Sequence, residues 1–317
     1  MSNLSEQIAK SLGSENSYAV FTTDFDESLL NPIPRESLRE ENGVDSTNFT
    51  SGWDIWHCWE STFLLNSGLP IAGTIKIWIP STTDYIPESK SMKLFFNSFD
   101  MCTMGENRYE ATSNYVDTVS SSLNKLLFKD IPVNPKDRVR IKFFPYSELV
   151  RINDQATLDI YNHQTLEELI DKDVLDKTSF SNYQGGEELV FEETEEKTQV
   201  IKIRTNILRS RCRHTKQKDT GNIYLELLPI DGYKLDLVSL LKLIVSYREL
   251  NEFHEMCCEK MFSDILKTGL VKHLTIQLLY SRRGSLDINP IRTNHPNMDD
   301  KFLKGLVYPF LLKEMNQ

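Results

Sequence analysis

An element order that occurs twice along the 317 residues constrains the fold more than any other feature. Each half is predicted to run strand, strand, helix, helix, strand. In the first half the strands are predicted at residues 56–65 and 71–79, the helices at 89–99 and with an inward face from Tyr115 to Leu127, and the third strand at 138–144. In the second half the elements are predicted at residues 200–208, 223–228, 235–250, 253–267 and 273–280. Two related modules are the economical interpretation, and they place the chain in the α+β class.

The spacing of apolar residues separates the helices from the strands. Between Met92 and Phe99 the apolar side chains recur at i, i+3, i+4 and i+7, which is the spacing of one helical face. Between Thr74 and Ile79 isoleucine alternates with other residues, which is typical of a strand with one buried face. The boundaries that follow from these patterns are an N-terminal arm at 1–52, a first module at 53–150, a linker at 151–196 and a second module at 197–317.

Two stretches outside the modules carry local signals. The polar N-terminal arm contains the turn signal Asn31 to Pro34 and is predicted to lie extended over a domain. The linker contains a short helix candidate at 158–171 and an acidic run at 187–196, which is predicted to be a solvated face.

The net charge of the chain limits the classes of partner that it is expected to bind. The sequence has 36 Lys and Arg against 46 Asp and Glu, a net charge of -10 and a pI near 5.2. A field of this sign repels polyanions, so neither a nucleic-acid partner nor an anionic membrane is expected. No apolar run approaches the roughly 20 residues that span a bilayer, and residues 1–13 lack the apolar core of a signal peptide. Five cysteines without framework spacing suit a reducing compartment, so we expect a cytoplasmic protein.

Cys212 is the first candidate for chemistry. It follows a predicted strand and lies between Arg211 and Arg213, whose charges would stabilise a thiolate and so favour a nucleophile near neutral pH. Asp219, seven residues later, could fold back as an acid, a role that requires burial to raise its pKa. The alternative is that Cys212 is a small residue in a solvated basic loop.

Three further stretches could bind a ligand. Glu88, Ser89 and Lys90 begin a predicted helix, where backbone amides can receive a phosphate or a ring carbonyl, although the same residues also serve as an ordinary helix cap. Residues 251–255 offer an aromatic ring, an imidazole and two carboxylates that suit a flat polar base, or a histidine satisfied at a helix start. Arg282 and Arg283 beside Gly284 suit a phosphate, with Arg292 close behind in the sequence, although exposed arginines after a strand are also ordinary.

The sequence offers one candidate metal site and no dinucleotide-binding motif. Cys212, His214, His254 and Cys258 could together supply four zinc ligands, but no Cys-x-x-Cys pair exists and the two halves of the set lie far apart in sequence. No metal is therefore expected. The chain also lacks a Gly-x-Gly-x-x-Gly turn and a P-loop, so any nucleotide is bound in another way.

Four motifs in order make the chain resemble a known enzyme family. They are residues 88–95, the pair Cys212 and Asp219, residues 251–255 and residues 282–290. Together they are similar to the NADPH-dependent 7-cyano-7-deazaguanine reductases, the nitrile reductases of queuosine biosynthesis and hence of tRNA modification. The likeness is to the two-module branch and extends from Asp54 to Arg292.

The resemblance implies a fold and a set of roles. The fold would be two tandem tunnelling-fold modules, each a four-stranded antiparallel sheet with two helices inserted after its second strand. Cys212 would add to the nitrile carbon to form a covalent thioimide, and Asp219 would be the proton donor. The implied substrate contacts are Glu88, Ser89, Phe253, His254 and Glu255, and the implied NADPH contacts are Ser89, Lys90, Arg283 and Gly284.

These roles predict an oxidoreductase that reduces 7-cyano-7-deazaguanine to 7-aminomethyl-7-deazaguanine with NADPH and forms a homodimer. Two other functions remain open from the sequence. One is a zinc-dependent, pterin-type tunnelling-fold hydrolase. The other is a purine-binding module that keeps Glu88 and Glu255 but has lost turnover.

Overall fold

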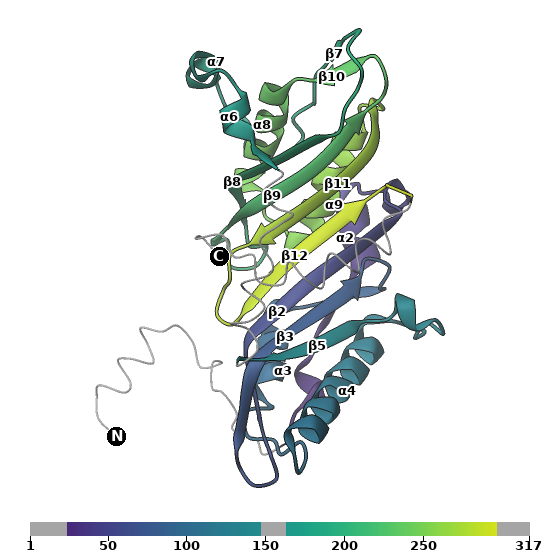
Figure 1. The fold of residues 1–317 in the computed structure, drawn as a ribbon, viewed down its shortest axis with the longest axis vertical. Helices are drawn as coiled ribbons and strands as arrows, with labels where there is room; N and C mark the ends of the chain where they lie inside the picture. Colours follow the sequence, from purple (N-terminus) through teal and green to yellow (C-terminus); the bar gives the residue numbers. More distant parts are fainter. Residues whose placement is uncertain (1–23, 147–162, 297–317) are drawn as a thin grey trace, which may run out of the picture.

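A computed structural model describes residues 24–146 and 163–296 and shows an α+β protein built on one eight-stranded sheet. The strand order is β5-β3-β2-β12-β11-β9-β8-β6, and neighbours are antiparallel except for the short parallel pair β6 and β8. The sheet twists along the length of the molecule, with the first half of the chain at one end and the second half at the other (Figure 1).

The predicted element order is present in both halves. The first half contains β2 (Ser51–Leu64), β3 (Pro70–Pro80), β4 (Tyr85–Pro87), α3 (Ser89–Asn97), α4 (Arg108–Leu127), η3 (Pro135–Asp137) and β5 (Arg140–Pro145). The second half contains β8 (Ile201–Arg211), β9 (Lys218–Pro229), β10 (Tyr233–Leu235), α8 (Leu237–Ser246), η5 (Tyr247–Glu249), α9 (His254–Leu266), β11 (Val271–Tyr280) and β12 (Leu286–Thr293). The repeated strand–strand–helix–helix–strand order is therefore confirmed.

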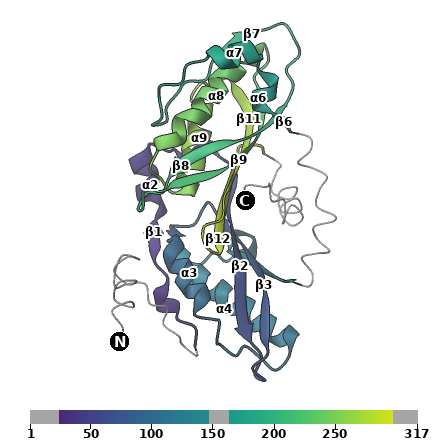
Figure 2. The ribbon, with the colours of Figure 1, turned by 90° about the vertical axis from the view of Figure 1, so that its left-hand side faces the viewer.

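The helices of both halves cover the same face of the sheet (Figure 2). Phe95 of α3, Tyr115 of α4 and Phe99, two residues after the end of α3, are fully buried against the inward residues of β2, β3 and β5. A second apolar cluster joins α8 and α9 to β8, β9 and β11. In these two cores the apolar side chains that recur at i, i+3 and i+4 along the helices pack against the apolar side chains that alternate along the strands. This is how amphipathic helices and half-buried strands pack.

Strand β12 was not predicted, and it connects the two halves. It pairs with β11 on one side and with β2 on the other, so that Asn289 lies opposite Ile55 and Pro290 opposite Asp54. All of its residues are buried. Because proline is rare in central strands and this stretch carries arginine and asparagine, its sequence does not follow the usual strand pattern.

A local motif also repeats ahead of the first covering helix of each half. In the first half β1 (Pro32–Pro34) pairs with β4, and in the second half β7 (Phe191–Glu193) pairs with β10. The Ser91 hydroxyl accepts a hydrogen bond from Asn31 N at 3.1 Å, and the Ser239 hydroxyl accepts one from Val190 N at 3.0 Å. The two halves thus share hydrogen bonds as well as element order.

The N-terminal region is more structured than an extended arm. Residues 1–23 lie outside the described residues, but residues 27–48 form η1 (Glu27–Leu29), β1, α2 (Arg35–Asn42) and η2 (Ser46–Asn48). Helix α2 contacts α9 and β4 near the middle of the molecule (Figure 1). It was missed because two of its three buried side chains are arginines, which hides its apolar face.

The helix predicted at 158–171 is replaced by shorter elements. Residues 158–162 lie outside the described residues, and the rest contain β6 (Gln164–Thr165) and α6 (Leu166–Leu169). Asp171 caps the following helix α7 (Lys172–Lys177). In the acidic run 187–196, only Leu189 is buried, so most of the run is solvated as predicted. No helix among the described residues is long and apolar enough to span a membrane.

Candidate active site

The hairpin between β8 and β9 brings Cys212 and Asp219 close together. Cys212 follows the last residue of β8, and its N–H donates to Gln217 O at 2.8 Å across the turn. Asp219 lies on β9 opposite Ser210. The spacing of seven residues therefore returns the carboxylate to the nucleophile's end of the hairpin, as a hairpin geometry predicts.

The environment of Cys212 favours its thiolate. Its partial burial acts to raise the pKa, but the Thr215 hydroxyl and the backbone amides of Thr215 and His214 hydrogen-bond to the sulfur and hold the pKa below its ordinary value. The nearby Asp219 carboxylate opposes this effect. By contrast, burial raises the pKa of the thiol in each of the other four cysteines, Cys58, Cys102, Cys257 and Cys258.

The two arginines beside Cys212 have a different role from the one predicted for them. Arg211 pairs with Glu249, and Arg213 pairs with both Glu41 and Glu252. Their charges are thus compensated by carboxylates. The low pKa of Cys212 comes instead from Thr215 and the turn amides, which sequence analysis missed because they become neighbours of the sulfur only when the turn closes.

Residues 251–255 lie directly beside this hairpin. Arg211 N donates to Leu250 O at 2.8 Å, and Glu252 N donates to Arg211 O at 3.1 Å. The Phe253 ring meets the His214 ring edge to face, with centroids 5.5 Å apart. The structure therefore brings two of the predicted motifs together at the beginning of α9.

Asp219 is buried and contacts two other motif residues. Its Oδ1 lies 2.8 Å from Arg283 Nε, and its Oδ2 lies 3.4 Å from His254 Nε2. The His254 ring stacks on Tyr280, with centroids 3.7 Å apart and an angle of 9° between the planes. Within the part of the chain that the structure describes, His254 Nδ1 makes no hydrogen bond, so it remains available to a ligand.

Glu255 lies beneath the site in a buried environment. Burial raises its pKa to about 8, and the nearby Asp54 carboxylate acts in the same direction. Arg35 and Arg292, which lower this pKa, both pair with Asp54 at 2.7 Å. The carboxyl of Glu255 therefore loses its proton near pH 8 and is mostly neutral below that pH.

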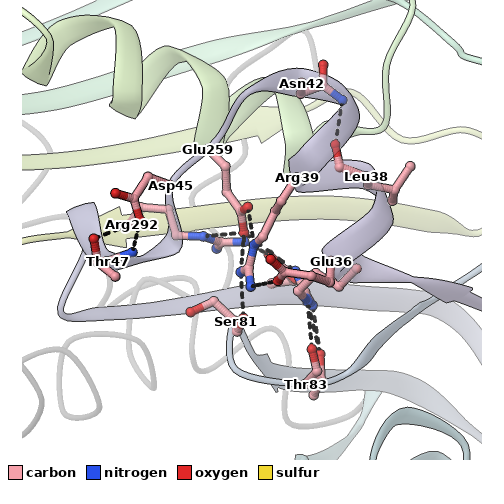
Figure 3. Close-up of polar contacts among 12 residues, drawn as sticks. Glu36, Leu38, Arg39, Asn42, Asp45, Thr47, Ser81, Thr83, Glu259 and Arg292 are labelled. Atoms are coloured by element: carbon pink, nitrogen blue, oxygen red, sulfur yellow. Dashed lines mark hydrogen bonds and ion pairs between the residues drawn. The ribbon is translucent and has the colours of Figure 1, made fainter.

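A buried group of charges holds this region together. Arg35, Arg39, Asp54, Glu259 and Arg292 come from α2, β2, α9 and β12 and are at most 7% exposed. Figure 3 shows Arg39 and Arg292 converging on Glu259, with Arg39 also reaching the Ser81 carbonyl. Arg292 follows the arginines at 282 and 283 in the sequence, but it is fully buried and pairs with Asp54 and Glu259.

The first half contributes Glu88 and Ser89 from the beginning of α3. Glu88 caps the helix, since its Oε2 accepts from Ser91 N at 2.7 Å. Ile86, two residues earlier, packs with Met256 of α9, and Phe253 packs against the same cluster. This cluster connects the beginning of α3 to the beginning of α9 across the boundary between the halves.

Lysine side chains of α3 lie near the glycine of the β11–β12 turn. Gly284 has φ +61, and a Cβ placed on it would lie 3.0 Å from Lys93 Nζ. Lys90 and Lys93 are exposed and form no ion pair with any described residue. Lys93 was not among the predicted contacts, and its i, i+3 spacing from Lys90 places both lysines on one side of the helix.

The four residues considered as zinc ligands, Cys212, His214, His254 and Cys258, do not form one site. No group of three or more His, Cys, Asp or Glu side chains among residues 24–146 and 163–296 is placed to hold a metal ion. His214 is exposed in the hairpin turn, whereas Cys258 is buried in α9 beneath the Pro290 carbonyl.

Comparison with known proteins identifies the family. A model described as "Nitrile reductase, 7-cyano-7-deazaguanine-reductase N-term" matches residues 21–134, and one described as "QueF-like protein" matches residues 219–299. Proteins named NADPH-dependent 7-cyano-7-deazaguanine reductase from Coxiella burnetii strains RSA 331 and CbuK_Q154 are each 31% identical over 282 residues, covering 87% of this chain and 90% of the relative. The crystal structure of the apo archaeosine synthase QueF-Like is 16% identical, with a TM-score of 0.27, and the match covers 32% of this chain and 96% of that chain.

These matches place the chain among the nitrile reductases. It belongs to the NADPH-dependent 7-cyano-7-deazaguanine reductase family.

Proposed function

We propose that this chain reduces the nitrile of 7-cyano-7-deazaguanine to an aminomethyl group with NADPH, as a step in queuosine biosynthesis. The observation that carries the proposal is the placement of a thiol of lowered pKa beside Asp219 and the 251–255 motif. A nitrile is a weak electrophile, so the reaction needs a thiolate and a proton donor in one place.

Substrate recognition is assigned to residues from both halves. Phe253 supplies a ring surface for the flat base, and Glu255 accepts hydrogen bonds from its guanine-like donor edge. His254 contributes its unpartnered Nδ1. Glu88 and Ser89 complete the set from the beginning of α3, which packs toward the same helix end.

The covalent step follows from the geometry of the hairpin. The Cys212 sulfur adds to the nitrile carbon, one of the carbon–nitrogen π bonds breaks, and its electron pair moves to nitrogen. The nitrogen takes a proton from Asp219, which yields a neutral thioimide. Asp219 donates from Oδ2, the oxygen beside His254, because Arg283 holds Oδ1.

The residues around Gly284 fit the phosphates of NADPH. The glycine leaves room for close approach, Lys90 and Lys93 are exposed cations, and Arg283, the residue before Gly284, pairs with Asp219. We assign Ser89, Lys90, Lys93, Arg283 and Gly284 to this role. When bound, NADPH supplies the hydride, and two equivalents are needed because a nitrile takes up four electrons.

The proposal also covers the modules of the enzyme, its oligomeric state and its cellular location. The repeated element order supports two tandem tunnelling-fold modules, with boundaries at 53–150 and 197–317 flanking the arm and linker. We further assign a homodimer as the working form. All five cysteines are free, which supports a reducing cytoplasm as its location.

The direct test is NADPH oxidation on addition of the nitrile to the purified protein. Consumption of two NADPH for each nitrile is expected. Binding of the nitrile without consumption would support the non-catalytic purine-binding module instead, and nitrile-independent activity that requires stoichiometric zinc would support the hydrolase.

A further inference from the structure

Arg213 bridges three segments that lie far apart in the sequence. Its Nη2 lies 2.8 and 2.7 Å from the two carboxylate oxygens of Glu41 on α2. Its Nη1 donates to Glu252 of the 251–255 motif. Its guanidinium carbon lies 5.9 Å from the centroid of the Phe253 ring. One side chain on the nucleophile's turn is therefore held both to α2 and to the substrate motif.

The turn is also connected to the second half of the chain, by the backbone bonds of Arg211 with Leu250 and Glu252 and by Arg283 Nη1, which donates to Gln217 Oε1 at 3.3 Å. Residues 214–218 are exposed, and Lys216 adopts φ 57, which is unusual for a residue other than glycine. The turn is closed by the pair Cys212 N to Gln217 O at 2.8 Å and Lys216 N to Cys212 O at 2.9 Å. These bonds shape the turn, and the ion pair of Arg213 with Glu41 adds a connection from the turn to α2.

Both carboxylates that hold Arg213 belong to well-anchored segments. Glu252 is 5% exposed, and its backbone N–H donates to Arg211 O. Helix α2 is fixed below Glu41 by Arg35 and Arg39, which are buried among Asp54 and Glu259. A planar guanidinium can satisfy two carboxylates at once and so transmits this anchoring to the turn.

We propose that Arg213 is a positioning residue that fixes the Cys212 hairpin against α2 and the substrate motif, so that the sulfur meets the nitrile carbon in a productive geometry. This rests on the proposed function. Arg213 acts through the position of the sulfur, since the hydrogen bonds that stabilise the thiolate come from Thr215 and the turn amides. Small misplacements of a reacting atom are costly, because the correct geometry is needed for attack.

Two variants and one matched control test this role. Arg213→Lys keeps the charge but cannot bridge both carboxylates, and Glu41→Gln removes the bidentate arm at a side chain that is 57% exposed. Glu40→Gln removes the same charge from the neighbouring, exposed position of α2 and serves as the control, because Arg213 pairs with Glu41 and Glu252 and not with Glu40. Thermal unfolding verifies that all three remain folded.

The measurements are the rate of covalent adduct formation with 7-cyano-7-deazaguanine in the absence of NADPH and the pH profile of Cys212 alkylation by iodoacetamide. Arg213→Lys and Glu41→Gln are expected to slow adduct formation about tenfold or more, with the midpoint of alkylation unchanged. Glu40→Gln is expected to match the wild type. Wild-type adduct rates in both variants, or a slower rate that a shifted alkylation midpoint explains, would overturn the inference. Absence of any adduct in the wild type would overturn the proposed function, and the inference with it.

Discussion

At the scale of single residues, the proposed chemistry depends on two groups whose charge is set by their surroundings. Cys212 is stabilised as a thiolate by a hydroxyl and two amides, whereas Glu255 is held toward its neutral form by burial. Both effects come from side chains and backbone that fold close to the group, and neither can be recognised from residue type alone.

Removing the Thr215 hydroxyl tests the origin of the thiolate. Thr215→Val loses a hydrogen bond to the charged sulfur, so the alkylation midpoint of Cys212 moves to higher pH and alkylation at neutral pH slows roughly 3- to 10-fold. Thr215→Ser keeps the hydroxyl and is the matched control. An identical alkylation profile for valine and serine would show that the turn amides alone stabilise the thiolate.

The pKa of Glu255 predicts how substrate affinity varies with pH. The free protein carries a protonated Glu255 below about pH 8, and the substrate's donor edge requires the carboxylate, so binding releases a proton. The dissociation constant should therefore fall by up to about tenfold per pH unit as pH rises toward 8 and become constant above it. Glu255→Gln should bind about 10- to 100-fold more weakly at pH 8 and lose this pH dependence, as calorimetry would measure. A wild-type affinity that is independent of pH would contradict the assignment.

At the scale of elements, hairpins and helix ends place the site. The strands β8 and β9 and the helices α3 and α9 could be predicted from local periodicity. The two strands were predicted to end at residue 208 and to begin at residue 223, however, so the tight hairpin that returns Asp219 toward Cys212 could not be predicted from periodicity. Strand β12 and helix α2 could not, because Pro290 and the buried arginines of α2 break the patterns that identify a central strand and an amphipathic helix. The neighbourhood of Glu255 and Asp54 also depends on contacts between distant segments.

The meeting of α3 with the β11–β12 turn predicts a role for Lys93. Lys93→Met keeps most of the length of the side chain but loses the cation beside Gly284, so the KM for NADPH should rise about tenfold while adduct formation without NADPH is unchanged. Lys136→Met, at an exposed lysine of η3, is the control. A matching loss of adduct formation would show that Lys93 acts on the covalent step.

At the scale of the whole molecule, one continuous sheet and one buried group of charges join the two halves. Strand β12 pairs with β2 along eight residues, and Glu259 contacts arginines from α2 and β12 directly behind this junction. The candidate site uses residues from both halves, so its geometry depends on this junction.

Glu259→Gln tests the contribution of the buried charges to stability. Removal of one partner from a buried ionic group leaves arginines uncompensated and should lower the free energy of unfolding by about 3–5 kcal/mol at pH 7. Glu36→Gln, at a carboxylate that is 71% exposed and 3.9 Å from Arg39, should change it by less than about 0.5 kcal/mol. Urea unfolding measures both. Equal effects of the two substitutions would show that the buried group is replaceable.

The same charges predict a loss of stability in acid. The arginines hold the pKa values of Asp54 and Glu259 below their ordinary values of 3.8 and 4.5 despite burial, which acts to raise them. Carboxylates with depressed pKa values in the folded state stabilise it above their unfolded pKa and lose this contribution as pH falls through the folded value. The urea midpoint should therefore decline below about pH 4. Glu255 acts in the opposite sense, since its raised pKa costs stability as pH rises from 4.5 to about 8.

Mass spectrometry of the intact protein mixed with 7-cyano-7-deazaguanine, without NADPH, tests the central claim most directly. The wild type should gain the mass of one nitrile molecule, and Cys212→Ala should bind the nitrile without gaining mass. No mass gain in the wild type, or an equal gain in Cys212→Ala, would contradict the assignment of this cysteine as the nucleophile.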